Sequence, residues 1–515
     1  MKIFLSQSKL RIPKLLFVCF CLTSGKLAWS EPFYVPEPEL EKAICETLGI
    51  TREELSGELI ARDLRSLVVV GRQIRSLQGL EVAENLDTLV LKNNLISDLS
   101  PLSDLPSLRI LDLSGNRISS LRDLASLSRS RMEKRIMEIK SALEDHKFPK
   151  DQKAEIILEL SENLQRLKRG PWSLQKINLA NNRLLGLSGI GELTSLVHLD
   201  VSANALIDLE GVGNLKSLHT LYAQRNQLGR VEGFEDTNRN KQFDEGEPIE
   251  DKSGNGKRDV DPLVELDSLP RLTNLHLYDN QIATTALIKG LPSLRILLLS
   301  GNAIRKISGL EGSSNLTTLS LSNNKIGSLA GIDAFSNLQS LHLVENWICD
   351  LRPLSTLSNI RELSLQRNQL MDVTPLRSLT ALEILHLSNN LIYDPKPLWG
   401  LDKLRRLSLG GNCIDLENYK IQTSMGEMKS KGVLVRASEQ RRRIIPAEKL
   451  ISVLSGNPSS NISLGDYLLT NGYFRLIDLI EDSSVTEEDK EVAFNSWESR
   501  LKIGKSLEDL SFPGR

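Results

Sequence analysis

Oxygen-bearing side chains recur at every second position in residues 236–259, which read DTNRNKQFDEGEPIEDKSGNGKRD. Calcium is bound by carboxylate, amide and carbonyl oxygens, and a calcium loop supplies them at alternate positions before it closes with a carboxylate. Counted from the first aspartate, the residues at this spacing are Asp236, Asn238, Asn240, Gln242 through its carbonyl, Asp244 and Glu247. The stretch therefore predicts a structural calcium site.

A second, incomplete loop follows the first. Its candidate ligands are Asp251, Ser253, Asn255, Lys257 through its carbonyl, and Asp259. Gly256 stands where such loops need a left-handed turn, but Pro262 occupies the place of the closing carboxylate. The first loop has the reverse defect, with Lys241 at the turn. The alternative interpretation is a solvated hydrophilic loop, and the alternation of ligand types favours calcium over it.

The chain around this stretch has a 22-residue period. An asparagine recurs at that interval in three blocks, which are Asn94 and Asn116, then Asn182, Asn204 and Asn226, then Asn280, Asn302, Asn324, Asn346, Asn368, Asn390 and Asn412. With a degenerate first copy at 64–74, in which Arg72 takes the asparagine place, the chain holds about thirteen copies. Internal repeats of this length indicate a solenoid.

Each copy predicts a short strand, a turn and a tight return. The leucines of the "LxxLxL" motif end with period two, which is typical of a strand. The asparagine after it can bond neighbouring backbone across a turn and tie one coil to the next. The later apolar positions are three residues apart, the period of a 3₁₀ helix, as in Ile96, Leu99, Leu102 and Leu105. Because one copy cannot bury its apolar face alone, stacked copies predict a parallel sheet on the concave side.

These repeats resemble leucine-rich repeats of the 22-residue, internalin-like type over roughly residues 33–435. The motifs DLSPL (98–102), DLRPL (350–354) and DVTPL (372–376) match the back half of that repeat, and FYVPEPELEKAICETLGITREEL (33–55) is similar to its helical N-terminal cap. The resemblance implies an α/β solenoid, a leucine-rich repeat horseshoe with a parallel concave sheet and 3₁₀ convex turns. It also implies a protein that binds other molecules. The stretch 236–262 is similar to the helix-poor calcium loops of secreted modules.

The period and its interruptions divide the chain. We expect a signal peptide at 1–30, a helical N-terminal cap at 31–63, repeats 1–3 at 64–127, a helical insertion at 128–172, repeats 4–6 at 173–235, the acidic calcium-loop-like insertion at 236–262, repeats 7–13 at 263–422, a C-terminal cap at 423–445 and a C-terminal helical region at 446–515. Both insertions are expected to leave the repeat at the same phase, just before a strand, and so to emerge from one rim. The helical insertion carries two apolar stripes, one through Ile136 and Ile139 and one through Ile156 and Ile157.

The first thirty residues predict export. A basic start with Lys2, Lys9 and Lys14 precedes the apolar run LLFVCFCL, and LAWS offers a cleavage site before Glu31. We therefore expect a secreted, periplasmic or cell-envelope protein with no transmembrane segment after cleavage. Lysines and arginines number 64 against 66 acidic residues, so no basic footprint points to nucleic acid. Cys45, Cys349 and Cys413 remain, and the last two are too far apart in the repeat to form a disulfide.

The outward positions of the strands carry an unusual set of side chains. Four of the six histidines fall there, with two tyrosines beside them. One predicted patch comprises His198, Asp200, Tyr222, Gln224, Arg225, His276, Tyr278 and Asp279, and a second comprises His342, Glu345, Trp347, Gln366, Arg367 and His386. Aromatic and arginine side chains on a rigid exposed face are typical of interface anchors. The alternative is that any concave face must hold polar residues.

We therefore expect an exported protein that binds a protein partner through its concave face. Glycan or cell-envelope recognition is the first alternative, since stacked tyrosines beside amides also suit sugars. If the signal peptide prediction is wrong, the alternative is a scaffold similar to a cytosolic phosphatase-regulating repeat protein. No zinc-protease, serine-hydrolase or Walker motif is present, so we expect no enzyme. Calcium is the only cofactor expected.

Overall fold

The structure is a computed structural model, and it describes residues 33–103, 105–122, 174–229, 263–310, 312–438 and 440, with isolated positions between 136 and 161. The predicted signal peptide at 1–30, both calcium-like loops at 236–262 and the helical region at 446–515 lie outside the described residues.

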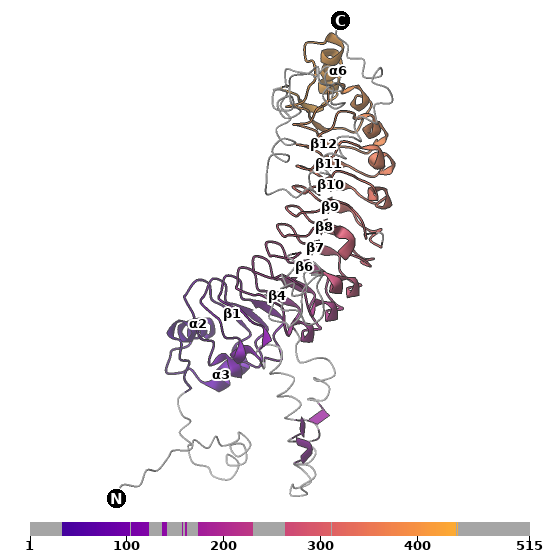
Figure 1. The fold of residues 1–515 in the computed structure, drawn as a ribbon. Coiled ribbons are helices and arrows are strands. Elements are labelled where there is room, and N and C mark those ends of the chain that lie inside the picture. Colours follow the sequence, from indigo (N-terminus) through magenta and orange to yellow (C-terminus); the bar gives the residue numbers. More distant parts are fainter. Residues whose placement is uncertain are drawn as a thin grey trace, which may run out of the picture.

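Fourteen short strands form one parallel sheet in which the order of the strands is their order along the chain (Figure 1). Their bounds are β1 Ser66–Val68, β2 Thr88–Val90, β3 Ile110–Asp112, β4 Lys176–Asn178, β5 His198–Asp200, β6 Thr220–Tyr222, β7 Asn274–His276, β8 Ile296–Leu298, β9 Thr318–Ser320, β10 Ser340–His342, β11 Glu362–Ser364, β12 Ile384–His386, β13 Arg406–Ser408 and β14 Leu434–Arg436. The first thirteen are the strands of the predicted repeats. The leucine-rich repeat solenoid predicted from the period is confirmed.

The return half of most coils is a 3₁₀ helix, as the three-residue apolar spacing predicts. These segments are η1 Leu80–Val82, η2 Ser100–Leu102, η3 Ile190–Glu192, η4 Val212–Asn214, η5 Val264–Ser268, η6 Thr285–Leu287, η7 Ile332–Ala334, η8 Arg352–Thr356, η9 Thr374–Ser378 and η10 Lys396–Leu398. Figure 1 shows them on the outer side of the curved stack, with the strands on the inner side. Because a 3₁₀ return needs more room than a strand, the stack curves towards the sheet.

Leucine and isoleucine side chains fill the space between the sheet and the 3₁₀ segments. In β5 the middle residue Leu199 is fully buried, while His198 and Asp200 on either side of it are partly exposed. The same alternation repeats in nearly every coil, and one continuous cluster of buried apolar residues runs from Val35 to Ala437. The apolar core is therefore as long as the stack itself.

The recurring asparagines bond coil to coil. Asn324 is representative: its Nδ2 donates to the carbonyl of Leu299 in the preceding coil (3.0 Å) and of Leu321 in its own coil (3.0 Å). Its Oδ1 accepts from the amide of Ile304 (3.0 Å). The side chain thereby satisfies backbone groups that the turn would leave unpaired inside the protein. The function predicted for these asparagines is confirmed.

Helices close the N-terminal end, as predicted. Helix α2 (Pro38–Leu48) and helix α3 (Gly57–Asp63) stand before β1. Arg72, which replaces the asparagine of the first repeat, reaches back to α2 and pairs its Nη2 with Glu46 (2.8 Å). Glu37, at the start of α2, accepts from the amides of Arg75 (3.1 Å) and Ser76 (3.3 Å). The cap therefore supplies the bonds to the first coil that a preceding coil would otherwise make.

A helix and a strand close the other end of the described stack, as the sequence predicts. Helix α6 (Tyr419–Ser430) leads into β14, which pairs with β13. Gln440 then takes the place of the repeat asparagine: its Nε2 donates to the carbonyls of Leu409 (2.9 Å) and Ala437 (2.7 Å), and its Oε1 accepts from the amide of Ile414 (3.1 Å). The longer amide spans a coil that is wider than the others.

The two insertions do not leave the repeat at the same phase, so the prediction of a single rim is wrong. Leu121 lies eleven residues after the start of β3, and Leu263 lies eleven residues before the start of β7. In a 22-residue period these two places are equivalent. Leu121 comes before the first insertion, whereas Leu263 comes after the second. The second insertion thus divides the sixth coil, which η5 completes afterwards.

Within the helical insertion, the described positions are helical. Ile136 and Ile139 are buried, as their apolar stripe predicts. Ile157, in the second apolar stripe, is 55% exposed. The three described cysteines form no disulfide with one another, as expected from their spacing.

Candidate functional site

The residues of the first predicted patch lie side by side on β5, β6 and β7. The register places Asp200 beside Tyr222, and Tyr222 beside His276. The rings of Tyr222 and His276 contact each other with centroids 4.5 Å apart and planes tilted by 53°. Because the intervening leucines are buried in the core, these side chains face the inner surface. The structure therefore brings together an aromatic cluster, Tyr222 and His276 with Tyr278 at the end of β7.

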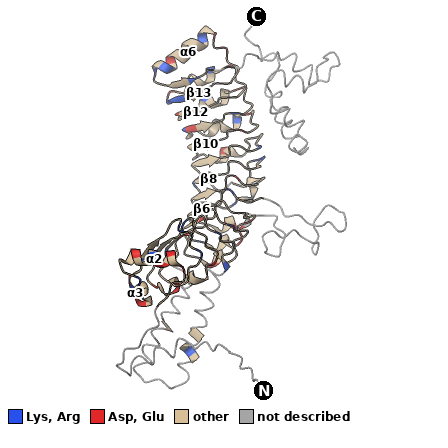
Figure 2. Cartoon of the chain, turned by 90° about the vertical axis from the view of Figure 1, so that its left-hand side faces the viewer, with Lys and Arg blue, Asp and Glu red and all other residues tan. Residues whose placement is uncertain are grey.

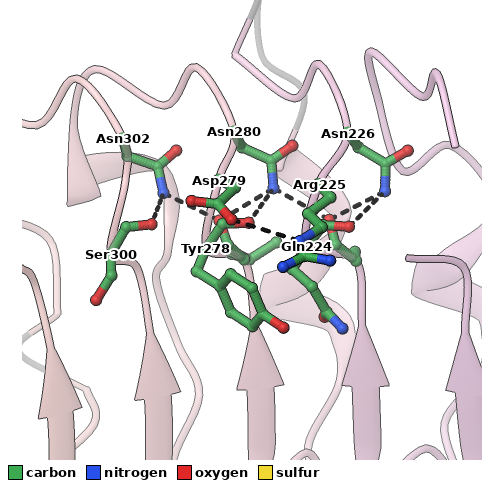
Figure 3. Close-up of polar contacts among 10 residues, drawn as sticks. Gln224, Arg225, Asn226, Tyr278, Asp279, Asn280, Ser300 and Asn302 are labelled. Atoms are coloured by element: carbon green, nitrogen blue, oxygen red, sulfur yellow. Dashed lines mark hydrogen bonds and ion pairs between the residues drawn. The ribbon is translucent and has the colours of Figure 1, made fainter. Parts of the chain in front are cut away.

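Polar groups follow this cluster where the strands end (Figure 3). Arg225 and Asp279 form an ion pair, with Nε and Oδ2 3.6 Å apart, between exposed side chains. Such exposed pairs add little stability. The Oε1 atom of Gln224 is buried and has no hydrogen-bond partner among the described residues. Arg225 and Asp279 are exposed, so a bound molecule can reach their charged groups.

The histidines of this patch are held neutral. Burial, and then the charge of Lys176, lowers the pKa of His198. Burial likewise lowers the pKa of His276, and the nearby carboxylate of Asp200 opposes that effect only in part. Both rings are therefore uncharged at neutral pH and suited to packing and hydrogen bonding.

The second predicted patch is divided. On β10, His342 has Ser340 at 2.9 Å from Nε2 and Ser364 at 3.3 Å from Nδ1. On β12, His386 has Ser408 at 3.1 Å from Nδ1. The whole of β11 separates the two histidines, so they share no ligand, and the described residues contain no group of three metal-binding side chains. Glu345 and Arg367 form an ion pair at the strand ends, close to Gln366, whose Oε1 is buried without a partner among the described residues.

Trp347 is not part of this face. The side chain is only 6% exposed, so its predicted place in the second patch is wrong. It follows the turn at Asn346 and lies outside the alternation of the strand. Coils stack about 5 Å apart, so neighbouring coils cover a ring of that size.

Small and apolar residues form the surface between the two patches. Leu298 follows His276 in the next strand, and Ser320 follows Leu298. Ser300 and Ser320 bond through their hydroxyls (2.7 Å), and Ser322 accepts from the amide of Val344 (3.1 Å). Tyr278 and His276 lie on one side of these residues and His342 lies on the other, so β8 and β9 form a low surface between larger side chains.

Two surface features were missed by the sequence reasoning. At the N-terminal end of the inner face Val68 and Val70 are 61% and 51% exposed, and Ile110 lies two strands further on. The run of apolar residues 67–70 could have revealed them, because a strand directs alternate residues outward. At the other end a groove of about 480 Å³ separates η10 from α6, lined by Lys396, Trp399, Tyr419, Lys420, Ile421, Thr423 and Ser424.

Comparison with known proteins agrees with the fold. A family model described as leucine-rich repeats in two copies matches residues 84–126, 292–334 and 314–357. No curated protein matches the chain. No helix among the described residues has the length and apolar character needed to cross a bilayer.

Solved structures share this fold at low sequence identity. An internalin from Listeria monocytogenes is 21% identical, with 81% of this chain and 94% of that chain covered and a TM-score of 0.52. The Toll–Spätzle complex from Drosophila is 18% identical, with 75% of this chain and 50% of that chain covered and a TM-score of 0.50. The functional domain of InlJ from Listeria monocytogenes is 16% identical, with 74% and 75% covered and a TM-score of 0.44.

Proposed function

We propose that this leucine-rich repeat protein holds a protein partner against its inner face, with the cluster of Tyr222, His276 and Tyr278 as the central contact. The observation that carries the proposal is the contact between the tilted rings of Tyr222 and His276 across β6 and β7, with centroids 4.5 Å apart. The contact fixes two large rings on a rigid sheet before any partner arrives. Ordering side chains on binding is costly, so pre-ordered rings favour tight association.

The surroundings of the cluster support binding rather than catalysis. The low surface of serines and apolar residues on β8 and β9 can receive the partner's side chains. The Toll chain, which shares this fold, is found in a complex with Spätzle. We also propose that the chain is exported, because residues 1–30 combine a basic start, an apolar run and a cleavage site.

The double substitution Tyr222→Ala and Tyr278→Ala is expected to weaken partner binding about 1,000-fold, because aromatic residues at the centre of an interface each contribute around 2 kcal/mol and about 1.4 kcal/mol is tenfold. The measurement is affinity capture with the full chain, followed by titration of the recovered partner. The matched control is Tyr34→Ala with Tyr419→Ala, which removes two exposed tyrosines from outside the sheet face. Unchanged affinity of the first variant would refute the inner-face proposal, and selective binding to a glycan array would replace it with sugar recognition.

We propose, from the sequence alone, that residues 236–262 bind calcium as a structural ion. A ligand that binds only the folded state must stabilise it. We expect millimolar calcium to raise the melting temperature of the full chain relative to chelator, and Asp236→Asn with Asp244→Asn to abolish that rise. Magnesium at the same concentration is the control for ionic strength. An identical melting temperature with calcium and with chelator would end the proposal.

A further inference from the structure

The last three strands of the sheet bring basic side chains together on the inner face. In the register of β12, β13 and β14, Ile384 stands beside Arg406 and Arg406 beside Leu434. One step further along the strands, His386 stands beside Ser408 and Ser408 beside Arg436. The residues between these rows, Leu385, Leu407 and Val435, are buried in the core. Arg406 and Arg436 therefore face the same side, on adjacent strands.

These two arginines differ from the others nearby in having no acidic partner. Glu383 already lies between Arg361 and Arg405, with oxygens 3.7 Å from Nη1 of the first and 3.5 Å from Nε of the second. Among the described residues, neither Arg406 nor Arg436 forms a salt bridge, and both are exposed. Figure 2 shows basic residues on β13 at this end of the stack. The outward strand positions of β11–β14 carry Arg406 and Arg436 against one acidic residue, Glu362, so this face attracts negative charge.

His386 adds a third polar group to the pair. Its Nδ1 is 3.1 Å from the hydroxyl of Ser408, which lies between His386 and Arg436 in the register. Burial, and then the charge of Arg406, lowers the pKa of this histidine, with a smaller effect from Arg436 in the same direction and an opposing one from Glu362. The ring is close enough to both guanidinium groups to respond to their charge.

Apolar side chains flank the basic ones. Leu434, beside Arg406, is 47% exposed, and Ile384 on the other side is half-buried. Apolar surface of this kind gains free energy when another apolar side chain covers it. A ligand made only of anionic groups, such as inorganic phosphate or a sulfated sugar, would leave both side chains uncovered. An extended peptide with acidic residues two positions apart and an apolar residue two positions further on presents all three side chains on one face, so it would satisfy the arginines and also contact the apolar side chains beside them.

We propose that Arg406 and Arg436 form a binding site for an extended peptide segment that carries two acidic side chains two residues apart and an apolar side chain two residues further on, all on one face of the segment. The two arginines are one strand apart and two residues out of step, a separation of roughly 8 Å. Carboxylates two residues apart on an extended chain are separated by roughly 7 Å, so each can meet one arginine. Arginine pairs with carboxylates through two parallel hydrogen bonds, which fixes the register of the segment. The inference rests on the proposed function, since the segment would belong to the protein partner held on the same face.

The test is a titration of the full chain with the fluorescein-labelled peptide GSDSDSLSG, whose two aspartates and leucine share one face when it is extended, followed by fluorescence anisotropy. We expect saturable binding that weakens as salt is added, because exposed charge pairs are screened. We expect the amide counterpart GSNSNSLSG to bind at least tenfold more weakly. We expect Arg406→Gln with Arg436→Gln to lose at least tenfold in affinity for the acidic peptide while keeping the melting temperature of the parent protein.

The control variant is Arg271→Gln with Arg377→Gln, which removes the same charge from exposed positions outside the β12–β14 face and is expected to bind within twofold of the parent. Equal affinity for the acidic and amide peptides, or equal loss in both arginine variants, would overturn the proposal. Displacement of the peptide by heparin at lower concentration than by unlabelled peptide would overturn it in favour of a polyanion site. The Tyr222→Ala and Tyr278→Ala variant is expected to bind this peptide normally, so loss of the arginine site and loss of the aromatic contact are told apart.

Discussion

Replacing Asn280 by alanine is expected to destabilise the protein by on the order of 3–5 kcal/mol, because one side chain satisfies three backbone groups inside the stack. Its Oδ1 accepts from the amide of Leu228 (3.1 Å), and its Nδ2 donates to the carbonyls of Ala223 (3.0 Å) and Leu277 (3.0 Å). Figure 3 shows this bonding between β6 and β7. Alanine leaves all three groups without a partner, and each unpaired buried group costs about 1–3 kcal/mol.

Asn280 is also the residue that joins the two coils across the second insertion, since Leu228 and Ala223 precede it by 52 and 57 residues. The measurement is urea denaturation, together with hydrogen exchange of the Leu228 amide, which should lose protection in the variant. Asn214→Ala is the control, because that asparagine is exposed on η4 and its side chain makes no hydrogen bond to the described residues. A loss of stability no greater than that of the control would contradict the function assigned to the asparagine ladder.

The second large effect is expected at Gly309, where alanine should cost roughly 2–5 kcal/mol from backbone strain and overpacking together. The residue has φ of 78°, and a Cβ built on it would lie 2.5 Å from Cα and 2.9 Å from the carbonyl oxygen of Ala286. Those atoms belong to η6 of the preceding coil, which Thr285 holds close through its hydroxyl bonds to the carbonyl (2.6 Å) and amide (2.8 Å) of Ser308. The new Cβ would clash with backbone atoms of Ala286, so no flexible side chain could move aside to relieve the contact.

Gly71→Ala provides a control that separates strain from contact. Its φ is 69°, also left-handed, but a Cβ there would meet no atom within 4 Å. Only the conformational cost of about 1–2 kcal/mol is expected. The two variants are compared by chemical denaturation of the full chain. If they lose the same stability, the close approach of Gly309 to η6 has no energetic consequence.

The solenoid could be predicted because a short sequence pattern specifies each coil and repeats along the chain. Every copy follows the same rule: the leucines of the strand point into the core, an asparagine stands at the turn, and apolar residues recur at every third position of the return. A 22-residue period therefore fixes the parallel pairing, since Leu89 can meet only the equivalent leucines of the coils on either side. Most of the first binding patch follows from the same rule, because the outward places of β5, β6 and β7 are fixed once the register is known.

The predictions that were wrong concern positions outside the repeated rule. Trp347 was placed on the inner face by its residue type, but the position after the asparagine belongs to the flank, where coils cover each other. The insertions were placed on one rim because each precedes a strand in the sequence, but Leu263 shows that the sixth coil is completed after its insertion. The position of Leu263, counted back from the start of β7, would have shown that the insertion divides the sixth coil.

The sequence by itself determined the number of coils, the order and register of the strands, the asparagine ladder and the caps, because each depends on contacts between equivalent residues a fixed distance apart in the chain. Tertiary structure alone decided which side chains remain unpaired and exposed. Arg361 and Arg405 share Glu383, whereas Arg406 and Arg436 have no such partner among the described residues. The period fixes the backbone of each coil but not the residue types at the exposed positions of the inner face. The charge and contacts of that face therefore depend on the side chains of three neighbouring strands.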